Sequence, residues 1–122
     1  MTWNLPHLPW WLGKWVFLLR DRKRRVLTAA EFIGHDFAFN AEIVEHYEKG
    51  SFVIVQVGEE LVITSWEQYQ GEAFAFERKH PGLWHEVIDV YAHLQRTVSR
   101  GAAPPQSVRL AMLAKQFDEL TY

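Results

Sequence analysis

The sequence predicts an α+β fold, in which a small antiparallel sheet of two hairpins packs against helices. Two segments, residues 14–28 and 52–64, are rich in β-branched and aromatic residues, and each is interrupted by a polar turn. The last third of the chain instead repeats apolar residues at steps of three and four, which is typical of helices that bury one stripe. The 122 residues, 48% of them hydrophobic, suit one core, so we expect a single domain over residues 1–122.

The N-terminal segment argues against a regular helix, because its first 13 residues contain two prolines and Gly13. We expect residues 1–13 to form an extended arm rich in tryptophan and proline. In the first hairpin, over about residues 14–28, "KWVFLL" would be one strand, "RDRKR" the turn and "RVL" the return strand. The alternative is one helix from Pro9 to Arg25, which Gly13 weakens.

Capping signals predict two short helices between the hairpins. The sequence "TAAE" fits a capping box before a helix over residues 29–33, which Gly34 would end. Asn40 fits the N-cap of a second helix over residues 41–49, and Gly50 would supply its left-handed stop. The solvent face of this second helix would be acidic.

Three longer helices are expected after the second hairpin. Ser65 fits the cap of a helix over residues 66–79, although the alternating phenylalanines in this region would also suit a strand. Helices over residues 83–99 and 105–120 follow. The short Gly/Pro segment between these two helices predicts that they form an antiparallel pair.

Charge is distributed unevenly along the chain, although the net charge is only −2. Residues 1–25 carry a net charge of +5 and the remainder carries −7. Most of the positive charge lies in one run that only Asp21 interrupts: Arg20, Arg22, Lys23, Arg24 and Arg25. Such a split is a hint of contact with nucleic acid, an anionic surface or an acidic partner. It also fits docking of the basic end on the acidic middle of the chain or on a second copy.

No catalytic or cofactor motif stands out in the sequence. Cysteine is absent, which excludes disulfides, thiolate zinc sites and cysteine nucleophiles, and the glycine motifs that cradle phosphate are absent too. His85, Asp89 and His93 are spaced to share one helix face, but arginines on the same face would repel a metal ion. We therefore expect no cofactor, no metal and no enzymatic activity.

The sequence favours a non-enzymatic module that binds another macromolecule. Small regulators and inhibitors, among them those encoded by phages and mobile elements, share this combination of compact size and polarised charge. The leading hypothesis is a protein-binding regulator or inhibitor. Its contact surface would combine the basic run with four further residues: Trp10, Trp11, Glu42 and Glu45.

Nucleic-acid binding is the alternative, with the hairpin tip Arg20–Arg25 on the phosphates and the tryptophans stacked on unpaired bases. The net negative charge argues against it. A membrane-surface role is the weaker expectation, because aromatic and basic residues are present but a lipidation motif and a long amphipathic helix are not. The opposed charges are also compatible with a homodimer. Because the basic run follows the apolar run, a secretory signal is not expected and a cytoplasmic location is.

Overall fold

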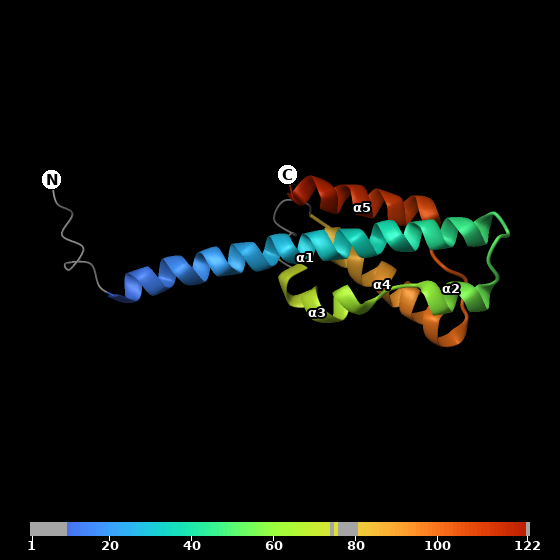
Figure 1. Ribbon diagram of the computed structural model, residues 1–122, viewed down its shortest axis with the longest axis horizontal. Helices are drawn as coiled ribbons and strands as arrows, with labels where there is room; N and C mark the ends of the chain where they lie inside the picture. The colour runs from blue at the N-terminus through green and yellow to red at the C-terminus, as the bar shows by residue number, and fades with distance from the viewer. Residues whose placement is uncertain (1–9, 74, 76–80, 122) are drawn as a thin grey trace.

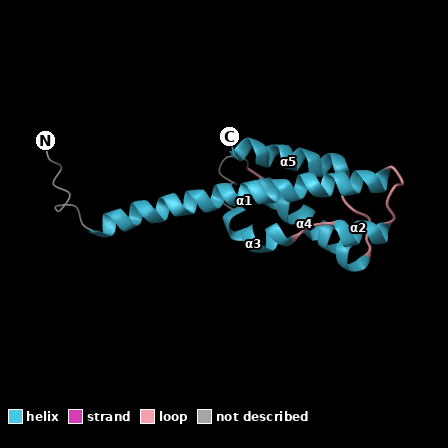
Figure 2. Ribbon diagram, viewed as in Figure 1, coloured by secondary structure: helices cyan, strands magenta, loops and turns pink. Residues whose placement is uncertain are grey.

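The computed structural model describes the backbone of residues 10–73, 75 and 81–121, and the side chains of residues 20, 23–72, 75 and 81–120. Five helices make up this part of the chain: α1 (Trp10–Glu48), α2 (Ile54–Glu60), α3 (Thr64–Ala73), α4 (Leu83–Arg100) and α5 (Ser107–Thr121). No strand occurs among the described residues (Figure 2). The predicted α+β class, with its sheet of two hairpins, is therefore wrong.

Helix α1 replaces the first hairpin, both short helices and the last part of the predicted arm. It runs for 39 residues, and its first half reaches beyond the other four helices (Figure 1). At 1.5 Å per residue this corresponds to roughly 57 Å. The segment "RDRKR", predicted as a turn, contains no proline or glycine, and arginine and lysine are good helix formers. The β propensity of "KWVFLL" is too weak a preference to end the helix, so the alternative of one helix through Arg25 is the better description of this region.

A continuous apolar stripe explains why α1 passes the positions where the sequence predicted helix ends. The stripe recurs at steps of three and four, and its members are all buried: Ala30, Ile33, Phe37, Ala41 and Val44. Burial of this stripe stabilises the helix across Gly34 and Asn40, because most helical stability in proteins comes from packing rather than from local propensity. The predicted boundaries at these two residues are wrong. The stop at Gly50 is confirmed, with a φ of 80°.

The second predicted hairpin, over residues 52–64, is also wrong. It forms α2 and an extended segment that leads into α3. Gly58 was expected at the hairpin turn, but it lies within α2 against α4, where a Cβ would lie 3.5 Å from the carbonyl oxygen of Thr97. Close packing of α2 on α4, with Val57 completely buried, outweighs the β propensity of the Val/Ile run.

The helices in the last third of the chain match their predicted ranges closely. Helix α4 begins as predicted and ends one residue later, at Arg100, where Gly101 adopts a φ of 69°. Helix α5 begins two residues later than predicted, at Ser107. Helix α3 ends at Ala73, and most of the remaining predicted range to residue 79 lies outside the described residues. Ser65, predicted to cap this helix, is instead its second residue, and its hydroxyl donates a hydrogen bond to Asp36 on α1.

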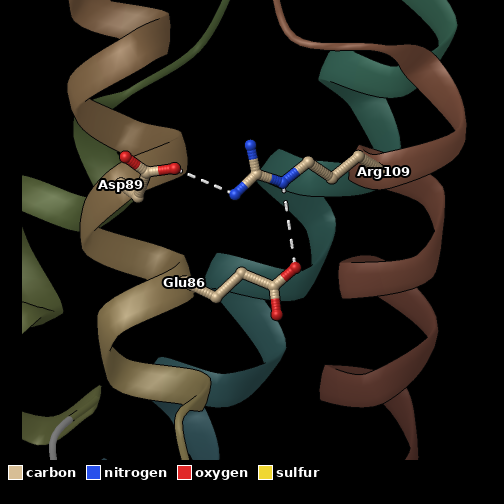
Figure 3. Close-up of polar contacts among 3 residues, drawn as sticks. All are labelled: Glu86, Asp89 and Arg109. Atoms are coloured by element: carbon tan, nitrogen blue, oxygen red, sulfur yellow. Dashed lines mark hydrogen bonds and ion pairs between the residues drawn. The ribbon is translucent and has the colours of Figure 1, made fainter.

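Helix α5 packs along α1 rather than pairing directly with α4 (Figure 1). Helices α4 and α5 do run in opposite directions, but the apolar stripe of α5 is buried in the core that α1 shares: Leu110, Leu113, Phe117 and Leu120. The link to α4 is polar: Arg109 Nη2 lies 2.9 Å from Asp89 Oδ2, and Arg109 Nε lies 3.8 Å from Glu86 Oε1 (Figure 3). The predicted antiparallel pair is therefore corrected to a fold built around α1.

Candidate functional site

The exposed side of the contact between α1 and α5 bears two adjoining hollows, of about 330 Å³ and about 460 Å³. Both are lined by Ala38 and Ala114, so they form one continuous depression. We call this depression the α1–α5 groove. It extends along α1 from Ala30 to Glu45 and along α5 from Ser107 to Asp118.

Small residues form the floor of the α1–α5 groove: Ala30, Gly34, Ala38, Ala41, Ala111 and Ala114. They allow the two helices to approach closely. At Gly34 an added Cβ would lie 3.1 Å from the Cβ of Phe117, which is tighter than an ordinary contact. The same small side chains leave room above them, so the depression follows directly from the composition of the helix contact.

The rim of the α1–α5 groove is mainly acidic. Four carboxylates and one lysine line the two hollows: Glu31, Glu42, Glu45, Asp118 and Lys115. Glu45 forms an exposed ion pair with Lys49, 2.8 Å from Nζ to Oε1. This bond lowers the pKa of Glu45 and raises that of Lys49. Glu42 and Glu45, chosen from the sequence as contact residues, therefore lie on the rim of this groove.

The basic run lies on the projecting half of α1 and not at a hairpin tip. Arg20, Lys23, Arg24 and Arg25 are all exposed on this helix. The first three are spaced at i, i+3 and i+4, so they share one side of the helix. Trp10, Trp11 and Arg22 also belong to α1, but their side chains lie outside the described residues.

The structure does not bring the basic run and the acidic residues together into one patch. Arg20 and Glu42 lie on the same continuous helix, 22 residues apart, which at 1.5 Å per residue is roughly 33 Å. A single small contact area cannot include both. The charges of helix α1 are therefore separated along its length, with positive charge on its projecting half and negative charge on the half that packs against the other helices.

A buried polar cluster links three helices inside the core. Ser65 Oγ donates to Asp36 Oδ1 at 3.0 Å, and the Tyr91 hydroxyl donates to Asp36 Oδ2 at 3.2 Å. Burial raises the pKa of Asp36, and burial next to this carboxylate raises the pKa of Tyr91 as well. All three side chains are buried and satisfied by one another, so the cluster joins α1, α3 and α4 rather than facing a ligand.

Two of the three residues that share the outer face of α4 are bound to neighbouring segments. Asp89 is held by Arg109, and a ring nitrogen of His93 lies 2.7 Å from the carbonyl oxygen of Ala103. His85 is exposed. Within the part of the chain that the structure describes, no three potential metal ligands come together. The geometry of this face is that of charge-compensated contacts between helices.

None of the helices in the described ranges combines the length and apolar character needed to cross a bilayer. Comparisons of the chain with family models, with curated proteins and with solved structures find no match.

Proposed function

We propose that this chain is a non-enzymatic protein-binding module, a small regulator or inhibitor, and that its contact surface is the α1–α5 groove. The observation that carries the proposal is the groove itself, which is exposed, continuous across two hollows and floored by small apolar residues. Its centre is apolar and its rim is charged, which is the usual anatomy of an interface between proteins.

Exposed apolar side chains beside the groove extend the area that a partner would cover. Val108, at the start of α5, is 65% exposed and lines the second hollow. Met112, one turn further along, is 63% exposed. Exposed apolar side chains next to a concave surface support recognition of another macromolecule.

The arrangement of the acidic residues suits recognition rather than acid–base chemistry. Glu31 and Glu42 are 11 residues apart on α1, or roughly 16 Å along the helix axis, which exceeds the separation of about 10 Å within which paired catalytic carboxylates lie. Glu45 is a neighbour of Glu42, but it is held in an exposed ion pair with Lys49. The buried carboxylate, Asp36, is occupied by its bonds to Ser65 and Tyr91. Such a rim would attract a positively charged partner.

The test fills the groove without disturbing the core. Ala38 and Ala111 are exposed residues that line the hollows, so Ala38→Trp and Ala111→Trp should each occupy the groove. Val55→Trp, at a 65% exposed position on α2, is the matched control for an added aromatic ring. Each variant is immobilised, and the proteins that it retains from an extract of the source cells are identified by mass spectrometry.

We expect the wild-type chain and Val55→Trp to retain the same partner and both groove variants to lose it. Circular dichroism spectra that match the wild type would show that the fold is unchanged. Retention of that partner by Ala38→Trp and Ala111→Trp would contradict the role of the groove.

A second candidate function is nucleic-acid binding through the projecting half of α1. The specific observation is that Arg20, Lys23 and Arg24 are exposed on one side of a helix that extends beyond the rest of the fold (Figure 1). A helix of this kind can lie in a major groove with its cations on the phosphates. Duplex and single-stranded probes at two salt concentrations test it, and absence of a mobility shift at low salt would rule it out.

A further inference from the structure

We propose that the partner in the α1–α5 groove is residues 10–25 of a second copy of this chain, so that two copies exchange the projecting halves of α1 in an antiparallel homodimer. This assignment rests on the proposed function, since it names the occupant of the same groove. Four observations carry it: a projecting helix of apolar sequence, matching lengths, complementary charge and complementary residue size.

None of the other helices formed by the described residues lies alongside the projecting half of α1. In Figure 1 it reaches beyond the ends of the other four helices. Its sequence from residue 10 to residue 19 is apolar except for Gly13 and Lys14. Helices that are apolar on all sides are normally buried, and a short isolated helix is only marginally stable in water. The composition of this segment therefore favours burial against a second molecule.

The lengths of the groove and of the projecting segment agree. The groove follows α1 from Ala30 to Glu45, and the segment runs from Trp10 to Arg25. Each spans 15 residue steps, or roughly 22 Å of helix. Because α1 is one continuous helix, residues 10–25 cannot fold back onto the groove of their own chain. A segment of this sequence that occupies the groove must therefore come from a second copy.

The charges are complementary in one antiparallel register. When the numbers of facing residues add up to about 55, Arg24 of one copy lies beside Glu31 of the other, and sequence position 14, a lysine, faces position 42, a glutamate. Two-fold symmetry repeats each pair, as in any isologous dimer. Segment 1–25 has a net charge of +5, and the groove rim has four carboxylates against one lysine. Electrostatic attraction of this kind favours the antiparallel orientation over the parallel one.

The residue sizes are complementary in the same register. Phe17 in the sequence of the segment falls opposite Ala38, where the floor of the groove is made of small residues. The two-fold axis falls between residues 27 and 28 of each copy. Leu27 is an apolar residue that is 40% exposed in the single chain, and the dimer would bring the two copies of Leu27 together. An exposed leucine at this position is thereby explained.

The experiment measures self-association of the full chain by sedimentation equilibrium, from micromolar to millimolar concentration. Arg24→Glu and Glu31→Arg each place like charges together at two symmetric contacts. We expect each to raise the dimer dissociation constant by about fivefold or more. The double variant restores opposite charges in exchanged order, so its dissociation constant should return to within about threefold of the wild type. Arg96→Glu, at an exposed position on α4, is the matched control and should change nothing.

A chain that stays monomeric throughout this range would overturn the dimer. An unchanged dissociation constant in both single variants would overturn it as well. So would a double variant that dimerises more weakly than either single variant. A monomer that sediments with vesicles of anionic phospholipid would assign the projecting segment to a membrane surface instead, which also overturns the dimer.

Failure of the dimer and failure of the proposed function give different results. If the chain is monomeric but loses a captured partner in the Ala38→Trp variant, the groove binds protein and only the identity of its occupant is wrong. If a dimer forms and Ala38→Trp leaves it intact, the groove is not the contact. That result would overturn this inference, and the capture experiment with Ala38→Trp would then decide the proposed surface on its own.

Discussion

The side chain of Asn40 forms two hydrogen bonds with the backbone of Val62. Its Nδ2 donates to the Val62 carbonyl oxygen at 2.8 Å, and the Val62 N–H donates to Asn40 Oδ1 at 2.8 Å. The extended segment between α2 and α3 has no neighbouring strand among the described residues, so this amide supplies the bonds that a strand would otherwise provide. Asn40 is completely buried, and the pair fixes this segment onto α1.

Replacement of Asn40 by alanine should lower the free energy of unfolding by about 2–4 kcal/mol, because it leaves the N–H and C=O of Val62 without partners and opens a small cavity. Equilibrium unfolding in urea measures the change. Gln70→Ala, at an exposed position on α3, is the matched removal of an amide and should change stability by less than about 0.5 kcal/mol. Equal losses in the two variants would show that the bonds to Val62 do not stabilise the fold.

The pH dependence of stability should reveal the buried carboxylate of Asp36. Burial raises its pKa above the usual 3.8, against the lowering effect of the hydrogen bonds from Ser65 and Tyr91. The folded chain therefore holds this proton more tightly than the unfolded chain does. Its contribution to stability is complete below pH 3.8 and is lost as the pH rises through the folded-state pKa.

The measurement compares the wild type with Asp36→Asn, which cannot ionise, by urea unfolding at a series of pH values. The free energy of unfolding of the wild type, relative to that of the variant, should fall as the pH rises from below 3.8 toward neutrality. Other titrating groups contribute equally to both proteins and cancel in the difference. A constant difference, or one that grows with pH, would contradict the assigned direction.

Two glycines in helices should respond to substitution in opposite directions. Gly34 faces Phe117 at close range, so Gly34→Val should overpack the contact between α1 and α5 and cost about 1–3 kcal/mol. A Cβ at Gly71 on α3 would meet nothing within 4 Å. Gly71→Ala should therefore stabilise the chain by up to about 1 kcal/mol through helix propensity. Thermal unfolding of both variants measures the contrast, and a stabilised Gly34→Val would disprove the close approach.

The sequence predicted a helix correctly where an apolar stripe and a terminal glycine both lie within the helix itself. Helix α4 has an apolar stripe on one side and a glycine at its end, and its predicted range matches the structure within one residue. Helix α1 was missed because the residues that were read as helix ends serve tertiary contacts instead. Glycine ends many helices, but Gly34 lies within α1 and allows Phe117 to pack closely against it. Asparagine caps many helices, but Asn40 lies within α1 and bonds Val62, 22 residues away. Only the tertiary contacts distinguish these roles.

Two of the residues chosen from the sequence, Glu42 and Glu45, line the candidate groove. The basic run and Glu42 were chosen from charge alone, and the structure places Glu42 on the groove. The groove itself was missed because its lining residues come from helices that are far apart in the sequence, such as Ala38 and Ala114, 76 positions apart. One signal for it was present: Ala30, Gly34 and Ala38 recur at four-residue spacing, which marks a helix face open to close approach.

The start of α5 is capped by the last residue of α1. The backbone N–H of Ser107 donates to Glu48 Oε2 at 3.1 Å, and its hydroxyl donates to Glu48 Oε1. A carboxylate at this position satisfies amide hydrogens at the end of the helix and interacts favourably with the helix dipole. Glu48 therefore performs for α5 the task that an N-cap residue usually performs from within the same segment.

Glu48→Ala should consequently lower the free energy of unfolding by about 1 kcal/mol, within the range measured for lost helix caps. Glu48→Gln keeps an acceptor oxygen but loses the charge, so its loss should be smaller and should depend less on salt than that of the alanine variant. Glu59→Ala, at an exposed position on α2, is the matched loss of a carboxylate. If thermal unfolding places Glu48→Ala and Glu59→Ala at the same midpoint, the contact with Ser107 contributes nothing beyond a surface charge, and α5 owes its start to packing on α1 alone.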